Sequence, residues 1–233
     1  MQYVWNGQTI RWFMEASAYT GFHKTLAGKI IPYLNKGDTL CDLGCGVGRL
    51  DLELAPYVSH LTAIDLNENA VSILRQDAEL SGLRNLSADC ADAGTLDGNF
   101  DILLTSFFGR PEMADLLRLC RRRLIRIVHM EIKGRLYPGR PRFTQKDTVD
   151  MVQQELAAMG VAYRLETDSI EFGQPFRSWQ DAVLFVRNNA SDACDGEIDG
   201  FLQDNIIRTG RDDFPFYLPN PKEFGIFVID REV

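Results

Sequence analysis

The sequence lacks an excess of positive charge. Its 25 lysines and arginines are outnumbered by 33 acidic residues, so the formal net charge at pH 7 is -8. A chain with this balance repels the phosphate backbones of nucleic acids unless its cations gather on one face. The composition therefore disfavours nucleic acid as a partner.

Long apolar segments are also missing. No stretch of the sequence has the length and apolar character of a membrane-spanning helix. The first ten residues hold two aromatic rings among polar side chains, in place of the basic stretch and apolar run of a secretory signal. We therefore expect no membrane association and a cytoplasmic location.

Cysteine is sparse and poorly spaced for metal binding. The five cysteines are odd in number, and no two of them stand in the Cys-x-x-Cys spacing of structural zinc sites. Cys41 and Cys45 have the spacing that opens an iron-sulfur loop, but Gly48 stands where the third ligand would be. We expect free thiols, no metal site and no radical chemistry.

The 233 residues, of which 45% are hydrophobic, suffice for one sizeable core and fit a single α/β domain with an insertion. Short apolar runs alternate with helical patterns along the first half of the chain. The expected strands are 39–43, 61–65, 85–88, 100–106 and 124–131, and the expected helices are 49–57, 68–80 and 111–122. This alternation predicts a parallel sheet with helices on both faces.

The flanking segments have patterns of their own. A capping box that begins at Thr144 opens a helix ending at Gly160, and strands are expected at 161–172 and 225–229. A second capping box begins at Ser178 and is followed by a polar turn and a further helix. We therefore divide the chain into an aromatic, helical lid segment (1–36) and a main domain (37–233) that contains an inserted helical cap (173–223).

A glycine-rich turn follows the first strand. Gly44, Gly46 and Gly48 permit backbone angles closed to other residues, and they leave no Cβ atom between the turn and a ligand. Arg49 occupies the place of the last glycine in the dinucleotide fingerprint Gly-x-Gly-x-x-Gly, so the spacing favours Gly-x-Gly-x-Gly instead. Alone, such a turn is also compatible with a tight strand-to-helix connection that binds nothing.

Acidic residues at the strand ends favour a ligand. Asp42 precedes the turn, Asp65 ends the second strand and Asp89 ends the third. The carboxyl ends of adjacent parallel strands meet at the crevice where α/β sheets bind ligands. A carboxylate there can accept both hydroxyls of a ribose, and another can accept an exocyclic amine such as that of adenine.

This ordered set resembles the class I S-adenosylmethionine-dependent methyltransferase family over residues 34–131. The resemblance implies a Rossmann-like, doubly wound, seven-stranded sheet that is mostly parallel, with the last strand antiparallel. It implies S-adenosylmethionine as cofactor and S-adenosylhomocysteine as product. The cofactor-binding residues that it implies are Asp42, Gly44, Cys45, Gly46, Gly48, Asp65, Leu66, Asp89 and Cys90.

By the same resemblance each residue has a part of the cofactor to contact. Asp42 approaches the amino-acid end, Asp65 holds the ribose, and Leu66 packs against the adenine. Asp89 holds the adenine amine, and the backbone amide of Cys90 meets a ring nitrogen. The cofactor carries a sulfonium and an ammonium, so a pocket lined by carboxylates suits its charge.

The acceptor is less well defined by the sequence. The segment after the fourth strand, 105–111, lacks the Asn/Asp-Pro-Pro-Tyr type of motif of amino-methylating enzymes, and no cysteine follows a proline as in cytosine C5 enzymes. Polyamine synthases resemble one another in an acidic residue where this chain has Thr105 and Ser106. Base methylation and aminopropyl transfer are therefore disfavoured.

Methyl transfer needs little more than positioning of the acceptor, so a general base is optional. If the acceptor must lose a proton, His129 and Glu131 near the end of the fifth strand are the candidate bases, although each could be structural or solvated. The candidate acceptor contacts, for which core packing is the alternative, are Trp12, Tyr19, Phe107, Phe108 and Arg110.

Our leading hypothesis from the sequence is a methyltransferase for a small-molecule acceptor, covered by the lid segment and the inserted cap. The alternatives are a protein or RNA methyltransferase and a non-catalytic S-adenosylmethionine-binding protein. We interpret the arginine-rich run 121–126 as a solvated helix end, and the stiff basic loop 135–142 as an indication of an anionic acceptor.

Overall fold

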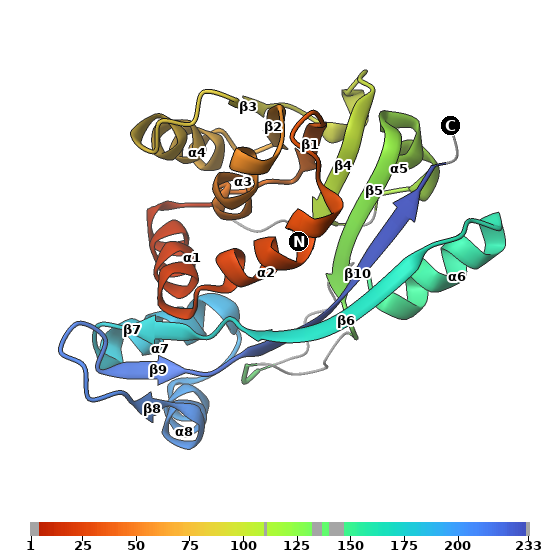
Figure 1. Ribbon diagram of the computed structural model, residues 1–233. Coiled ribbons are helices and arrows are strands. Elements are labelled where there is room, and N and C mark those ends of the chain that lie inside the picture. Colours follow the sequence, from red (N-terminus) through yellow and green to blue (C-terminus); the bar gives the residue numbers. More distant parts are fainter. Residues whose placement is uncertain (1–4, 110, 132–136, 140–146, 232–233) are drawn as a thin grey trace.

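A computed structural model describes residues 5–109, 111–131, 137–139 and 147–231 (Figure 1). Its main sheet has seven strands in the order β3-β2-β1-β4-β5-β10-β6. These strands are β1 (Thr39–Leu43), β2 (His60–Asp65), β3 (Leu86–Cys90), β4 (Phe100–Ser106), β5 (Cys120–His129), β6 (Arg164–Glu171) and β10 (Pro221–Asp230). Strands β1 to β5 pair in parallel, and β10 runs antiparallel to both β5 and β6. The predicted fold class is confirmed.

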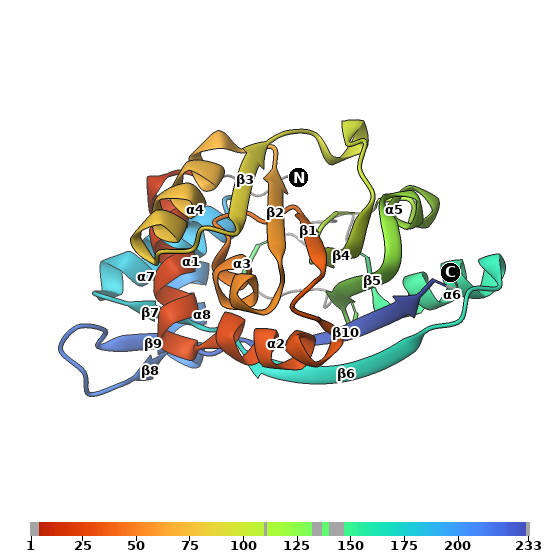
Figure 2. The same cartoon turned by 45° about the horizontal axis from the view of Figure 1, so that its top comes forward.

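Helices cover both faces of this sheet because its strands are apolar on both sides (Figure 2). On one face lie α2 (Phe22–Ile30), α3 (Arg49–Leu54) and α4 (Glu68–Leu80), packed on residues such as Leu40 and Ile102. On the other face lie α5 (Met113–Leu119) and α6 (Val149–Met159), packed on Cys41 and Leu103. Short 3₁₀ helices occupy Ile31–Tyr33, Ala55–Tyr57 and Ala93–Thr95.

Two helix boundaries differ from the sequence-based expectation. The helix expected over 111–122 ends at Leu119, because the chain from Cys120 onward pairs with β4 and the run of arginines lies in β5. Helix α6 is capped by Thr148, whose side chain accepts from the amide of Met151. Thr144, the expected cap, lies outside the described residues. The helix ends at Gly160 as predicted.

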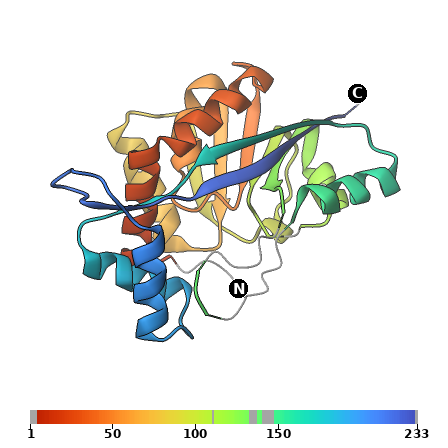
Figure 3. The same cartoon turned by 90° about the horizontal axis from the view of Figure 1, so that it is seen from below.

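The insertion between β6 and β10 forms a lobe beyond one end of the main sheet (Figures 1 and 3). It contains α7 (Trp179–Asn189), α8 (Asp195–Asn205) and a three-stranded antiparallel sheet in the order β7-β9-β8. The strands are β7 (Gln174–Phe176), β8 (Ile207–Arg208) and β9 (Phe216–Leu218). Their two or three residues are too short for an alternating pattern, so the sequence predicted only the helices.

The N-terminal helix α1 (Gly7–Thr20) is fastened to this lobe. Trp12 is 2% exposed, and its Nε1 donates to Asp181 of α7 at 2.9 Å. Arg11 forms an ion pair with the same carboxylate, and Gln174 of β7 donates to the backbone oxygen of Trp12. In the described part of the chain, no helix has both the length and the apolar composition needed to cross a membrane.

Candidate functional site

The glycine turn joins β1 to α3 at the carboxyl edge of the main sheet. The amides of Gly44 and Cys45 donate to the oxygen of Ile64 at 2.7 and 3.0 Å, which fastens the turn to β2. Gly48 begins α3 with φ of 65°, in the left-handed region, and a Cβ atom there would collide with the side chain of Leu74. Glycine at this position therefore serves close packing against α4 as well as the turn.

Aromatic rings lie directly on the other two glycines. A Cβ atom at Gly44 would collide with the ring of Phe108, and one at Gly46 would lie 2.6 Å from Cζ2 of Trp5. Phe108 comes from the segment after β4, and Trp5 comes from the residues before α1. The sequence-predicted residue Phe108 is thus brought to the glycine turn. Trp5 was not selected as a site residue, and only its place in an aromatic N-terminal segment signals it.

Asp65 stands at the end of β2 beside the turn. Its Oδ2 accepts from the amide of Gly46 at 2.9 Å, and its Oδ1 accepts from the amide of Asn67 at 2.9 Å. Each carboxylate oxygen has a second lone pair, so Asp65 can accept further hydrogen bonds from hydroxyls. Asp65 is therefore hydrogen-bonded to the glycine turn, next to which the sequence predicted it.

Two carboxyl groups are buried beneath the turn. Asp42 of β1 is 2% exposed and Asp51 of α3 is fully buried. The two carboxyl groups lie within hydrogen-bonding reach of each other, and no other side chain in the described part of the chain bonds to Oδ1 of Asp42 or to either oxygen of Asp51. Burial, followed by repulsion from Asp51, raises the pKa of Asp42 well above its usual range, and burial raises the pKa of Asp51 to about 7.

The remaining expected cofactor residues lie at the end of β2 and on β3. Leu66 is 55% exposed, and the side chains of Asp89 and Cys90 are exposed. Cys90 stands opposite Asp65 in the register of the two strands, and its Sγ donates to the oxygen of Leu66 at 3.4 Å. These residues form an open rim next to Asp65.

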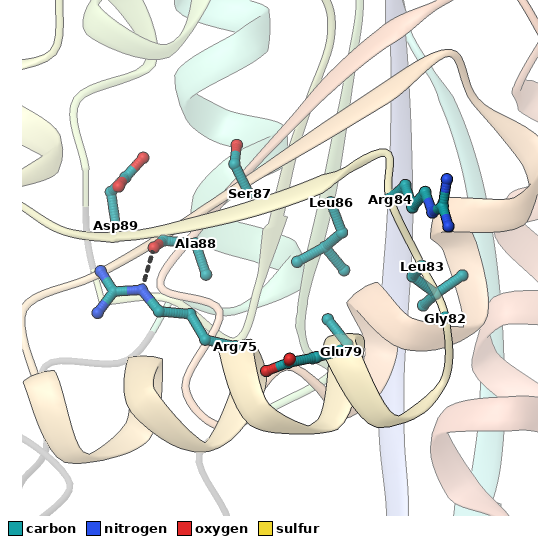
Figure 4. Close-up of a pocket in the computed structure, with 10 residues that line it drawn as sticks. Arg75, Glu79, Gly82, Leu83, Arg84, Leu86, Ser87, Ala88 and Asp89 are labelled. Atoms are coloured by element: carbon teal, nitrogen blue, oxygen red, sulfur yellow. Dashed lines mark hydrogen bonds between the residues drawn. The ribbon is translucent and has the colours of Figure 1, made fainter.

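A cavity of about 630 Å³ lies between α4 and β3 (Figure 4). Arg75 crosses it and donates to the oxygen of Ala88 at 2.7 Å. Leu86 and Ala88 point toward α4, whereas Asp89 points away from it. The glycine turn and Asp65 are not part of its lining. Of the expected cofactor-binding residues, only Asp89 lines this cavity.

The residues at the turn fit the expected cofactor. The buried carboxyl of Asp42 suits an ammonium, and the free lone pairs of Asp65 suit ribose hydroxyls. The glycines have left-handed backbone angles and no Cβ atom, so a ligand bound over the turn could approach their backbone amides closely. No group of His, Cys, Asp and Glu that could hold a metal ion occurs among the described residues.

Phe107 begins the segment after β4 in an unusual conformation. Its φ of 53° is the only left-handed angle of a non-glycine residue in the described part of the chain, and its amide donates to the oxygen of Ile127 at 2.9 Å. The ring centroid lies 4.8 Å from that of His129 and 3.4 Å from Nζ of Lys222. The sequence predicted Phe107 and His129 here.

Lys222 was missed, because it lies at the start of β10, far along the chain from Phe107. Antiparallel pairing of β10 with β5 brings it to the carboxyl edge of the sheet, where the rings of Phe22 and Phe172 also lie within 5.4 Å of its ammonium. Desolvation, followed by the positive charges of Lys222 and Arg49, lowers the pKa of His23 to about 3, so this imidazole is neutral at pH 7. The ammonium of Lys222, the neutral imidazole of His23 and several aromatic rings therefore lie together at this half of the edge.

The other expected acceptor residues lie elsewhere. Trp12 is buried between α1 and α7, and Tyr19 stacks on Tyr217 of the inserted lobe with ring centroids 5.0 Å apart. Both side chains pack against the inserted lobe, and their contact with an acceptor stays a prediction. Glu131 is exposed and lines a second cavity of about 440 Å³ with Glu223. Arg110 lies outside the described residues.

The part of the chain that contains the glycine turn is similar to known methyltransferases. Residues 40–126 match the family model described as a methyltransferase domain. A stretch of 57 residues is 44% identical to the 23S rRNA (uracil(1939)-C(5))-methyltransferase of Marinomonas posidonica, covering 24% of this chain and 13% of that protein. A second stretch, of 116 residues, is 26% identical to the ribosomal protein L11 methyltransferase of Thermotoga neapolitana. This match covers 47% of this chain and 44% of that protein. The chain spans less than half the length of these relatives.

Solved structures share the fold over most of the chain. Magnesium protoporphyrin IX methyltransferase from Synechocystis, with bound S-adenosylhomocysteine, superposes with a TM-score of 0.57 and 15% identity. The match covers 91% of this chain and 84% of that one. Identity this low supports a common fold and says nothing about the acceptor.

Proposed function

Because the chain carries a methyltransferase domain of the class I S-adenosylmethionine-dependent family over residues 40–126, we propose that it transfers the methyl group of this cofactor to a small-molecule acceptor. The bound cofactor supplies a methyl group already activated on sulfur. The protein has to bind the cofactor, exclude water and hold the acceptor in line with the methyl group.

The residues of the glycine turn bind the cofactor in this proposal. Asp65 accepts the ribose hydroxyls, Asp42 faces the ammonium, and Asp89 with the amide of Cys90 holds the adenine at the exposed rim. On the acceptor side, Phe107 and His129 lie together at the end of β4 and β5. Of the two candidate bases, His129 has the better position, because Glu131 is exposed beside a different cavity.

The observation that carries the small-molecule proposal is the cover over the turn. Trp5 lies on Gly46 and belongs to the segment that leads into α1. Helix α1 is in turn fastened to the inserted lobe through Asp181, by bonds from Arg11 and Trp12. An acceptor that must enter beneath this joined cover has to be small.

The distribution of charge also favours a small-molecule acceptor over RNA. The run of arginines that begins β5 is neutralised by neighbouring carboxylates, so it offers no phosphate-binding stripe. Its ion pairs are Arg121 with Asp101, Arg122 with Asp38, Arg123 with Asp230, and Arg126 with Asp147. The net charge of -8 acts in the same direction. Five free thiols fit a cytoplasmic location.

Calorimetric titration with S-adenosylhomocysteine tests the cofactor site. We expect binding by the wild-type protein and at least a tenfold loss of affinity in Asp65→Ala, since one charge-assisted hydrogen bond is worth about 1.5–3 kcal/mol. Asp199→Ala, an exposed carboxylate of α8, is the matched control and should bind normally. Equal affinity of Asp65→Ala and the control would contradict the assigned role of Asp65.

The acceptor class is tested with cofactor carrying a radiolabelled methyl group. Cell extract is divided into a low-mass fraction, a protein fraction and an RNA fraction, and each is offered to the enzyme. We expect label in the low-mass fraction. Label in protein or RNA instead would establish the alternative acceptors, and cofactor binding without transfer to any fraction would favour a non-catalytic protein.

A further inference from the structure

Asp42 and Asp51 are two buried carboxyl groups that have no positively charged partner in the described part of the chain. Asp42 shares its face of β1 with Leu40, and this face is covered by α3. Asp51 lies on the buried side of α3 with Leu50 and Leu54. Three of the four carboxyl oxygens are buried with no hydrogen bond to a side chain outside the pair, and neither residue has an ion pair in the described part of the chain.

The groups around the pair supply no compensating cation. The thiols of Cys41 and Cys45 stay neutral, because burial and the nearby carboxylates raise their pKa. Asp65 on β2 adds further repulsion to Asp42. Arg49, at the start of α3, is engaged by Asp77 of α4 at 3.1 Å. From the side of α2, His23 is neutral at pH 7.

Two neighbouring carboxylates that are buried and have no paired cation cannot both be ionised at low energetic cost, so one retains a proton. The amino-acid end of S-adenosylmethionine carries an ammonium, which is the charge that this pair lacks. Asp51 is not among the residues that the family resemblance assigns to the cofactor, and it does not reach the surface of the turn. It can act only through Asp42.

We propose that Asp42 and Asp51 share a proton when no cofactor is bound, and that the ammonium of the cofactor displaces this proton to solvent. Asp51 is then a positioning residue that sets the pH range of tight cofactor binding. The exchange is balanced: a carboxylic acid becomes a carboxylate, the ammonium keeps its protons, and one proton leaves. The inference rests on the proposed function, because it requires that the cofactor binds at this turn.

Titration calorimetry of the full chain with S-adenosylhomocysteine, in phosphate and in imidazole buffer at each pH, tests the exchange. We expect the heat of binding to differ between the buffers by an amount that corresponds to nearly one released proton at pH 6.0. Because the raised pKa of the pair keeps this proton bound at low pH, the affinity should be higher at pH 7.5 than at pH 6.0. Methylthioadenosine, which lacks the amino-acid end, should bind with equal heats in both buffers.

The variant Asp51→Asn keeps the shape of the side chain and removes its proton equilibrium. We expect its affinity for S-adenosylhomocysteine to depend less on pH between 6.0 and 7.5 than that of the wild type, and the difference in heat between the two buffers to be smaller, because the repulsion from Asp51 is gone while the burial of Asp42 remains. A purely structural role for Asp51 would not produce this change. If the variant does not fold, the heats of binding of S-adenosylhomocysteine and methylthioadenosine to the wild-type protein still test the proton exchange.

The outcomes separate this inference from the proposed function. Wild-type protein that binds S-adenosylhomocysteine with equal heats in both buffers overturns the proton exchange and leaves the cofactor assignment intact. Buffer-dependent heats for S-adenosylhomocysteine and not for methylthioadenosine support the exchange. Wild-type protein that binds neither ligand at any pH overturns the proposed cofactor site, and the inference with it.

Discussion

Replacing Asp181 by alanine should lower the free energy of unfolding by about 1.5–2.5 kcal/mol. The carboxylate accepts from Nε1 of Trp12 at 2.9 Å and from the amide of Arg177 at 3.3 Å, and it pairs with Arg11. Loss of the carboxylate leaves the indole N–H of Trp12 with only the side-chain oxygen of Gln8, 3.2 Å away, as acceptor, so the lost hydrogen bond costs about 0.5–1.5 kcal/mol. The partly exposed ion pair with Arg11 adds about 1 kcal/mol after screening by solvent.

Urea unfolding at pH 7 measures this difference, with Asp195→Ala as the matched control. Asp195 pairs with Arg187 at 2.6 Å, but the two side chains are 81% and 49% exposed, so its loss should change stability by about 0.5 kcal/mol or less. If Asp181→Ala unfolds at the same urea concentration as the control, the bond between α1 and the inserted lobe does not stabilise the fold, and our reasoning is wrong.

The difference in stability between the wild type and Asp181→Ala should depend on pH. Burial acts to raise the pKa of Asp181, but the bonds from Arg11 and Trp12 outweigh it and hold the pKa below its usual value. The stability that this group contributes is therefore present above the unfolded pKa of about 4 and is lost as the pH falls through the folded pKa. The difference between wild type and Asp181→Ala should shrink below pH 4.

Two further substitutions test the glycine turn. Gly48→Ala places a Cβ atom at φ of 65° against Leu74, so we expect a loss of about 2–4 kcal/mol in urea unfolding, and a loss under 0.5 kcal/mol would contradict the close packing. Asp51→Asn should raise the melting temperature of the cofactor-free protein at pH 7.5, because a carboxyl with a raised folded pKa contributes stability at low pH and loses it as the pH rises toward 7. This gain should vanish below pH 4, and a gain independent of pH would show that it does not come from ionisation.

The features that the sequence predicted correctly are those with a local signal. The apolar runs of β1, β2 and β4 and the spacing of Gly44, Gly46 and Gly48 depend on adjacent residues, and the parallel order of the strands follows from their alternation with helices. Asp65 could be placed beside Gly46 because both stand at the carboxyl ends of neighbouring strands. The roles of these residues in cofactor binding stay predictions.

The features that were missed depend on contacts between distant segments. Lys222 reaches Phe107 only through the antiparallel return of β10, and the aromatic residue Trp12 gives no sign that Asp181 will bind its indole. Asp51 did have a local signal. It interrupts an apolar helical face with Leu50 and Leu54, and an acidic residue in that position indicates a buried carboxyl.

The attachment of α1 to the inserted lobe also fixes an order of events during synthesis. Trp12 and its acceptor Asp181 are 169 residues apart in the chain. At a translation rate of about 5–20 residues per second, the first helix leaves the ribosome roughly ten to thirty seconds before its partner exists. During that interval the apolar side of α1, with Trp12 on it, has no lobe to pack against. The bond between Trp12 and Asp181 therefore forms only after almost all of the intervening chain has been synthesised.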